Sequence, residues 1–212
     1  VLLIVSMICA QGLPQALAQE EAAEPGEAAG PALSRESSPA GPENPLSAIF
    51  KSGSLEEVRG ALKMGADVNK VDGPDGMTPL MLAAAFNPEA QVIEFLISQG
   101  AEVNARENNF GLSPLMLAAS LNAPAVVEAL LSHGADANLR DKNGGTALYH
   151  AAINKPSAVN VIKLVMGGAD TSPSDQAGRT PLMQAASRGH IPALQAPTSA
   201  KPGLEVRDQA GR

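Results

Sequence analysis

Histidines, cysteines and paired acids are the side chains that most often bind metals or transfer protons, and here they form no known constellation. The 212 residues include three His and one Cys, Cys9. His133, His150 and His190 show no HxxxH, HExxH or histidine–carboxylate spacing. His150 falls at a core-facing position of TALYHAA, where we expect a partly buried, hydrogen-bonded side chain. The sequence therefore predicts no metal site.

Nucleophile and phosphate-binding motifs are also missing from the sequence. It contains no GxSxG motif, no phosphate-cradling loop and no ordered pair of acids. The glycine-rich KNGG at 142–145 is explained by its place in a turn. We expect no enzyme activity and no cofactor.

The charge of the chain is acidic and uneven. The net charge is −7, and most of it lies in residues 19–45, where six Glu accompany a single Arg. No basic patch could neutralise phosphates, so nucleic acid is not an expected partner.

The first 18 residues have the pattern of a secretory signal peptide. Residues 1–10 read VLLIVSMICA, and no charge appears before Glu20. Ala16-Leu17-Ala18 supplies a small-x-small cleavage pattern, which predicts a mature chain from Gln19 with no membrane segment. Because the sequence starts at Val1 without Met, we expect truncation at its front. The alternatives are an uncleaved anchor or a buried helix.

Residues 19–45 have the composition of a disordered tether. They are rich in Ala, Pro, Gly and Glu, contain one Leu and have no aromatic residue. Such a segment buries too little apolar surface to offset its ordering entropy, so we expect a flexible acidic linker. An acidic recognition tail is the alternative.

The elements that position these residues come from an internal sequence repeat. TPLMLAA at 78–84 is followed by SPLMLAA at 113–119, TALYHAA at 146–152 and TPLMQAA at 180–186, in steps of 35, 33 and 34 residues. A fixed period of this length is typical of a solenoid in which each repeat is one supersecondary unit.

Each repeat has the same internal order of signals. Thr or Ser followed by Pro or Ala starts a first helix, and an Ala pair lets that helix pack closely. A second apolar-periodic stretch, such as VIEFLISQGAEVN at 92–104, follows a short break. Gly then ends the second helix, and a turn leads to the next repeat. The pattern predicts an all-α solenoid of stacked helix-turn-helix units.

The four motifs resemble the ankyrin repeat, whose signature is T-P-L-H-x-A at a period near 33. The resemblance covers residues 46–212 and implies four to five repeats with protruding turns. These would be an N-terminal cap repeat at 46–77, repeats at 78–112, 113–145 and 146–179, and an imperfect or truncated repeat at 180–212. The His of the signature is replaced by Met81, Met116, Tyr149 and Met183, so its usual hydrogen bond should be missing.

The resemblance implies a protein-binding surface on the turn tips and on the exits of the first helices. Phe110 is an aromatic candidate anchor, or else folds down against the neighbouring tip. The candidate binding residues are Pro74, Met77, Phe86, Asn109, Phe110, Leu112, Leu121, Lys142, Asn143, Gln176 and Arg179.

Taken together, these features predict an exported, non-catalytic ankyrin-repeat scaffold that binds an unidentified protein. The signal pattern and the Ala/Pro-rich tether favour a bacterial, periplasmic or secreted protein, and we expect a monomer. The alternative is a fragment of a larger protein whose repeats target or regulate an absent catalytic domain. LEVRDQAGR at 204–212 resembles a turn leading into another repeat, so we expect that the sequence is cut short or that this end is damaged or frayed.

Overall fold

The computed structural model describes residues 45–71, 73, 75–153, 158–172, 174, 178–181 and 183. The predicted signal peptide, nearly all of the predicted linker and most of the last repeat lie outside these residues.

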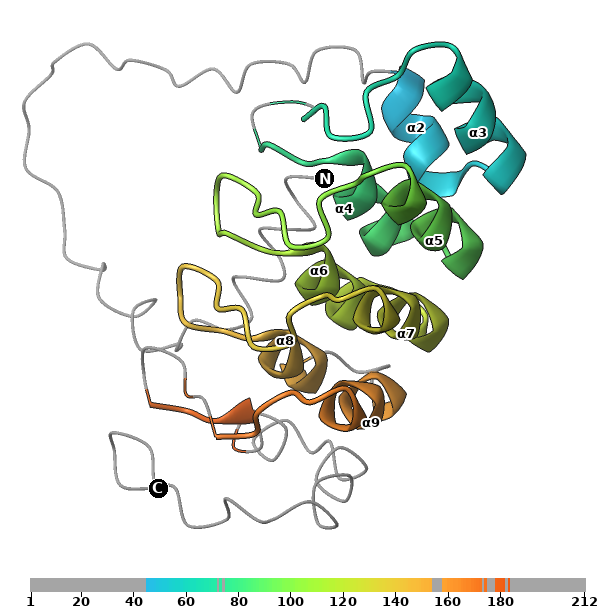
Figure 1. Ribbon diagram of the computed structural model, residues 1–212. Helices are drawn as coiled ribbons and strands as arrows, with labels where there is room; N and C mark the ends of the chain where they lie inside the picture. The colour runs from blue at the N-terminus through green and yellow to red at the C-terminus, as the bar shows by residue number, and fades with distance from the viewer. Residues whose placement is uncertain are drawn as a thin grey trace, which may run out of the picture. The chain divides into compact units, whose positions relative to one another are not determined.

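Eight helices in the described residues form four helix pairs (Figure 1). The first helices of the pairs lie in one layer and the second helices lie along the other side. The first helices are α2 (Pro45–Ser52), α4 (Pro79–Phe86), α6 (Pro114–Leu121) and α8 (Ala147–Ile153). The second helices are α3 (Leu55–Lys63), α5 (Ala90–Ser98), α7 (Pro124–Ser132) and α9 (Ala158–Met166). The predicted all-α repeat solenoid is confirmed.

The first helices begin where the Thr and Ser signals predict. The hydroxyls of Thr78, Ser113 and Thr146 each accept a hydrogen bond, of 3.3 Å, from the backbone N–H three residues later. These bonds satisfy donors that the helix itself leaves unpaired.

The methionines that replace the signature histidine also take part in capping, although the sequence predicted a lost hydrogen bond. The backbone N–H of Thr78 points at the sulfur of Met81 at 3.5 Å, and that of Ser113 at the sulfur of Met116 at 3.4 Å. A thioether is a weak acceptor, so the interaction is retained in a weaker form.

The first helices α4, α6 and α8 are buried along almost their whole length. In α4 every residue from Pro79 to Ala85 is buried, and in α8 every residue is buried. The paired alanines expose no more than 2% of their surface, and their small size allows the close approach of neighbouring helices.

The second helices all end at glycines with positive φ. Gly65, Gly100, Gly134 and Gly168 have φ of 94°, 92°, 85° and 90°. The next residue in each repeat donates its N–H back to a carbonyl five residues earlier, as Ala101 does to Leu96 at 3.0 Å. This left-handed helix end lets the chain leave the helix layers.

One asparagine in each closing turn ties its repeat to the next. The side-chain nitrogen of Asn104 donates to the carbonyl of Gly134 at 3.3 Å, and its oxygen accepts from the N–H of Asp136 at 2.9 Å. Asn69 and Asn138 make the same two bonds at their own junctions. We call these three residues the asparagine ladder. It fixes the register of successive repeats.

Candidate functional site

The candidate site is the row of loops that connect each second helix to the next first helix. These loops extend to one side of the helix layers (Figure 1). We call residues 66–77, 101–112, 135–145 and 169–179 tips 1 to 4. They hold most of the residues that the sequence assigns to binding.

Neighbouring tips are joined by hydrogen bonds. The N–H of Asn108 donates to the carbonyl of Asp75 at 2.9 Å, and the N–H of Lys142 donates to the carbonyl of Phe110 at 2.8 Å. Side chains add to this, because Asn109 donates to the carboxylate of Asp75 at 2.7 Å. Three successive tips are therefore bonded into one row.

Two arginines strengthen the row at its base. Arg106 donates through Nε to the carbonyl of Gly111 at 3.1 Å, and its guanidinium also contacts the carbonyl of Arg140. Arg140 donates in turn to the carbonyl of Ser174 at 3.2 Å. Each arginine thus joins its own tip to the following one.

A buried glutamate braces tip 2 from within. The carboxylate of Glu107 accepts hydrogen bonds from three backbone N–H groups, those of Asn109 and Phe110 at 2.6 Å and that of Leu112 at 3.0 Å. Its side chain is buried, so these bonds replace the water that the charge would otherwise need.

Asp141 does the same in tip 3 and also reaches a helix. Its Oδ1 accepts from the N–H groups of Asn143 and Gly145 at 2.8 Å, and its Oδ2 lies 2.7 Å from Nε2 of His150 on α8. Burial alone would raise the pKa of Asp141, but the His150 hydrogen bond and charge and the two N–H donors outweigh it. The pKa is therefore lowered.

The sequence prediction for His150 is confirmed, since its side chain is buried and hydrogen-bonded. Glu107 and Asp141 were missed as supporting residues. One signal was available for them: each acid directly follows an arginine at the same place in its repeat, in Arg106-Glu107 and Arg140-Asp141. An acidic residue that recurs at the same turn position in successive repeats indicates that both residues have the same structural role.

The structure places most of the predicted binding residues on or near the surface. Exposed residues are Asn109, Lys142, Asn143 and Leu121, and partly buried residues are Phe86, Phe110 and Arg179. Asn109, Phe110, Lys142 and Asn143 are brought together in tips 2 and 3. Leu121 and Phe86 instead lie at the ends of the first helices. Pro74 and Gln176 lie outside the described residues.

Two of the predicted binding residues are corrected by the structure. Met77 is only 2% exposed and Leu112 only 1%. Each directly precedes the capping residue of a first helix, where the chain has already returned from the tip into the core. They hold the base of a tip and offer no side chain to a partner.

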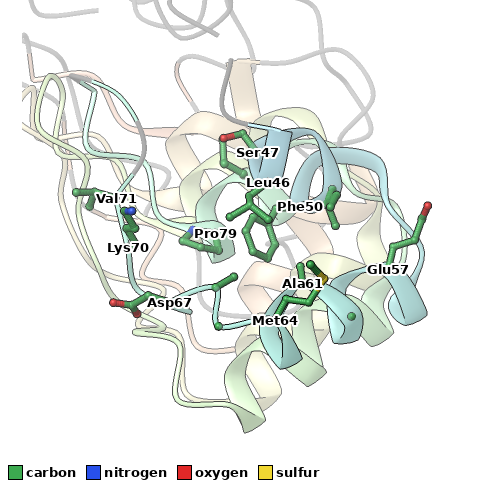
Figure 2. Close-up of a pocket in the computed structure, with 15 residues that line it drawn as sticks. Leu46, Ser47, Phe50, Glu57, Ala61, Met64, Asp67, Lys70, Val71 and Pro79 are labelled. Atoms are coloured by element: carbon green, nitrogen blue, oxygen red, sulfur yellow. The ribbon is translucent and has the colours of Figure 1, made fainter. Parts of the chain in front are cut away.

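A pocket of about 770 Å³ lies at the N-terminal end of the helix layers (Figure 2). Leu46 and Phe50 of α2, Ala61 of α3 and Pro79 of α4 line it, and Met64 lies at its edge. Met64 is 90% exposed. The remaining lining residues are Ser47, Ile49, Glu57, Gly60, Gly65, Ala66, Asp67, Lys70, Val71 and Leu82.

The described residues were compared with the ligand sets that hold metal ions in proteins. Among them, no three His, Cys, Asp or Glu side chains gather as metal ligands would. The buried carboxylates of the tips, Glu107 and Asp141, are instead engaged in holding the loops. In the same part of the chain no helix has the length and apolar character needed to cross a bilayer.

Comparison with known proteins agrees with this geometry. A family model described as ankyrin repeats matches the chain in three overlapping copies, at residues 46–141, 85–175 and 115–196. A search of curated protein sequences gives no significant match. The matched region covers well over half of the sequence, and it contains all eight helices apart from Pro45, the first residue of α2. The chain belongs to the ankyrin repeat family.

Proposed function

We propose that this chain is a non-catalytic scaffold that binds a protein partner through tips 2 and 3. Ankyrin repeats are protein–protein interaction modules and are generally not catalytic. The proposed contact residues are Asn109, Phe110, Lys142 and Asn143, together with Phe86 and Leu121 at the helix exits.

The observation that supports this most directly is the rigid construction of the tips. Glu107 and Asp141 hold the backbone of two successive tips from inside, while Asn109, Lys142 and Asn143 remain exposed on the outside. A surface that is already ordered loses little conformational entropy on binding. A modest number of contacts at the tips can therefore give useful affinity.

The test is a site-specific cross-linking experiment with the full chain. A photoreactive residue would replace Asn109 or Asn143 in one pair of variants, and Gln91 or Ser98, on the outer face of α5, in a control pair. We expect one protein to cross-link to both tip variants and to neither control. Equal labelling of the two faces, or no labelling at the tips, would contradict the proposal.

The anchoring role of Phe110 needs its own variant. Phe110 is partly buried, so its ring is available for contact without being fully exposed. Once a partner is identified, Phe110→Ala should weaken binding by roughly tenfold or more, as truncation of an aromatic anchor does. Unchanged affinity would remove Phe110 from the binding surface.

We also propose that the protein is exported and works in a periplasm or outside the cell. Support comes from the sequence alone, through the apolar run at 1–10 and the small-x-small pattern at 16–18. Residues 1–45, preceded by an initiating Met and a short basic leader and fused to a reporter enzyme that folds only in an oxidising compartment, should give activity. Ala16→Arg and Ala18→Arg together should block cleavage, and a reporter that stays inactive with the wild-type segment would refute export.

A further inference from the structure

Each tip has a glycine with positive φ two residues before the capping residue of the next first helix. In tips 1 to 3 this glycine is Gly76, Gly111 or Gly144, with φ of 70°, 73° and 83°. Residues with a side chain rarely adopt this left-handed conformation, so the repeat requires glycine here. The residue before the glycine is not fixed in this way, and in the three tips it is Asp75, Phe110 and Asn143.

Tip 3 therefore contains an Asn-Gly dipeptide, and the sequence has no other. The two residues of such a dipeptide can react with each other. The backbone nitrogen of the glycine attacks the side-chain carbonyl carbon of the asparagine, and a five-membered succinimide ring forms as ammonia leaves. Glycine favours this step because it has no Cβ to shield its nitrogen.

Asn143 has the exposure and the freedom that this reaction needs. Its side chain is exposed in tip 3, and Gly144 is partly exposed, so water reaches both residues. The backbone N–H of Asn143 donates to Oδ1 of Asp141 at 2.8 Å. Within the described part of the chain, no hydrogen bond engages the side-chain amide of Asn143. The amide can therefore turn toward the nitrogen of Gly144 without breaking a side-chain bond.

Other asparagines of the solenoid use their amides to hold the structure. Each of them donates a hydrogen bond through its side-chain nitrogen, and each is followed by a residue larger than glycine. They are Asn69, Asn87, Asn104, Asn109, Asn122, Asn138 and Asn160. Asn143 differs from them in both respects, because its amide is not held and its neighbouring nitrogen is not shielded.

The turn of tip 3 slows the reaction. The N–H of Gly144 donates to the backbone carbonyl of Asp141 at 3.1 Å. Oδ1 of Asp141 also accepts from the N–H groups of the residues on either side, Asn143 and Gly145, at 2.8 Å. A nitrogen that donates this bond cannot attack, so the turn must open before the ring can form. Exposed loops open at low cost in free energy, so the reaction is slowed and still proceeds.

We propose that Asn143 is a site of spontaneous deamidation in the folded protein, at a rate set by opening of the tip 3 turn. Hydroxide removes the N–H proton of Gly144, whose nitrogen then bonds to Cγ of Asn143. The Cγ–N bond of the side-chain amide breaks, and its nitrogen takes up a proton from water and leaves as ammonia. Water that adds at Cγ opens the ring to aspartate. Water that adds at the main-chain carbonyl carbon gives isoaspartate, in which the backbone runs through the side chain.

Both products change tip 3. Each replaces a neutral amide with a carboxylate next to Lys142, which adds a negative charge to the tip. Isoaspartate also inserts a methylene into the backbone between the N–H groups of residue 143 and Gly145. Asp141 can then no longer hold both donors in their present places. The chemical step needs no partner and goes beyond the proposed binding function.

Incubation of the full chain, folded in buffer or unfolded in guanidinium chloride, tests this proposal. Digestion with pepsin in acid, where the reaction stops, and fragment mass spectrometry then locate the modification. We expect residue 143 to gain the mass that replacement of NH₂ by OH adds, and to gain it faster at mildly alkaline pH. The folded chain should react roughly tenfold more slowly than the unfolded chain, because a turn hydrogen bond must open first.

Two exposed asparagines of the same sample, Asn104 and Asn109, are internal controls and should remain unmodified in the folded chain. Asn143→Gln is the matched variant. It keeps an exposed amide, but its longer side chain would have to close a six-membered ring, which forms far more slowly. No conversion of Asn143 in the folded protein while the unfolded chain is fully converted would overturn the proposal. Equal conversion of Asn104 and Asn109, or of Asn143→Gln, would do so too.

The role of the turn has its own measurement. Ion exchange separates the deamidated chain by its added negative charge, and hydrogen exchange then compares the two forms. The amide of Gly145 should exchange faster in the isoaspartate form, because Asp141 no longer holds it. Equal rates of deamidation in the folded and the unfolded chain would refute control by the turn. None of these measurements uses a binding partner, so they fail or succeed independently of the proposed function.

Discussion

Nε2 of His150 lies 2.7 Å from Oδ2 of Asp141, and both side chains are buried. Because the pKa of Asp141 is lowered, its carboxylate is ionised and can only accept hydrogen bonds. Nε2 of His150 must therefore carry the proton. The contact connects helix α8 to the loop that presents Lys142 and Asn143, so the core of one repeat determines the shape of its tip.

The first prediction concerns Asp141 and acid. The lowered pKa of Asp141 means that the folded protein holds the ionised carboxylate more favourably than the unfolded chain does. The ionised carboxylate therefore stabilises the fold, and this contribution is complete above the ordinary aspartate pKa of about 3.9. It is lost as the pH falls through the lower folded-state pKa. Asp141→Asn should destabilise the protein at pH 7 by about 1–3 kcal/mol. The difference from wild type should shrink in acid.

Urea unfolding at neutral and at acid pH measures this effect. Asp136→Asn is the control, because Asp136 is exposed and its Oδ1 bond to the N–H of Asn138 is available to an amide oxygen too. It should change the unfolding free energy by no more than about 0.5 kcal/mol. A gap between wild type and Asp141→Asn that stays constant with pH would contradict the assigned role of the carboxylate.

The second prediction concerns Glu107. In Glu107→Gln one carboxylate oxygen becomes an NH₂ group, which cannot accept from a backbone N–H. We expect a loss of about 1–3 kcal/mol and faster hydrogen exchange at the amides of Asn109, Phe110 and Leu112. Exposed Glu102→Gln serves as the comparison. Unchanged exchange at all three amides would show that Glu107 does not brace the tip.

The third prediction concerns the asparagine ladder. Asn104→Ala removes two hydrogen bonds between repeats, those to Gly134 and Asp136. Because the site is exposed and water can replace part of what is lost, we expect a cost of about 1 kcal/mol in thermal or urea unfolding. Asn143→Ala, at the exposed apex of tip 3, should cost less than about 0.5 kcal/mol. Equal effects would argue against a special role for the ladder.

The fourth prediction uses two glycines that have open space around them but different backbones. Gly134 has φ of 85°, so Gly134→Ala should destabilise by about 1–2 kcal/mol from left-handed strain. Gly60 lies within helix α3, so Gly60→Ala should stabilise by up to about 1 kcal/mol. The two Gly→Ala variants should therefore shift the unfolding midpoint in opposite directions. Shifts in the same direction would contradict this account.

Much of the fold could be predicted because its signals are local and repeated. Thr78 and Ser113 are capping residues followed by proline, and Gly100 and Gly134 permit a left-handed helix end. Each signal acts within a few residues, so the sequence order is sufficient to place it. Repetition at a near-constant period then implies stacking.

The site was less predictable because its bonds depend on burial and on distant neighbours. Asp141 and His150 are nine residues apart, a spacing that belongs to no common motif, and only the folding of tip 3 over α8 brings them together. Met77 and Leu112 look like loop residues in the sequence. They are buried because the chain re-enters the core one residue before the capping residue of the next helix. The residue types of the turn do not show where this happens.

The asparagine ladder also has a consequence for how the protein unfolds. Asn69, Asn104 and Asn138 make the same pair of bonds at three junctions, so each repeat is coupled mainly to its immediate neighbours. A linear array of this kind behaves as a one-dimensional cooperative system, in which a broken junction divides the stack into two shorter and less stable blocks. Damage at the central junction should therefore cost more cooperativity than the same damage at either end, and unfolding should advance from the ends inward.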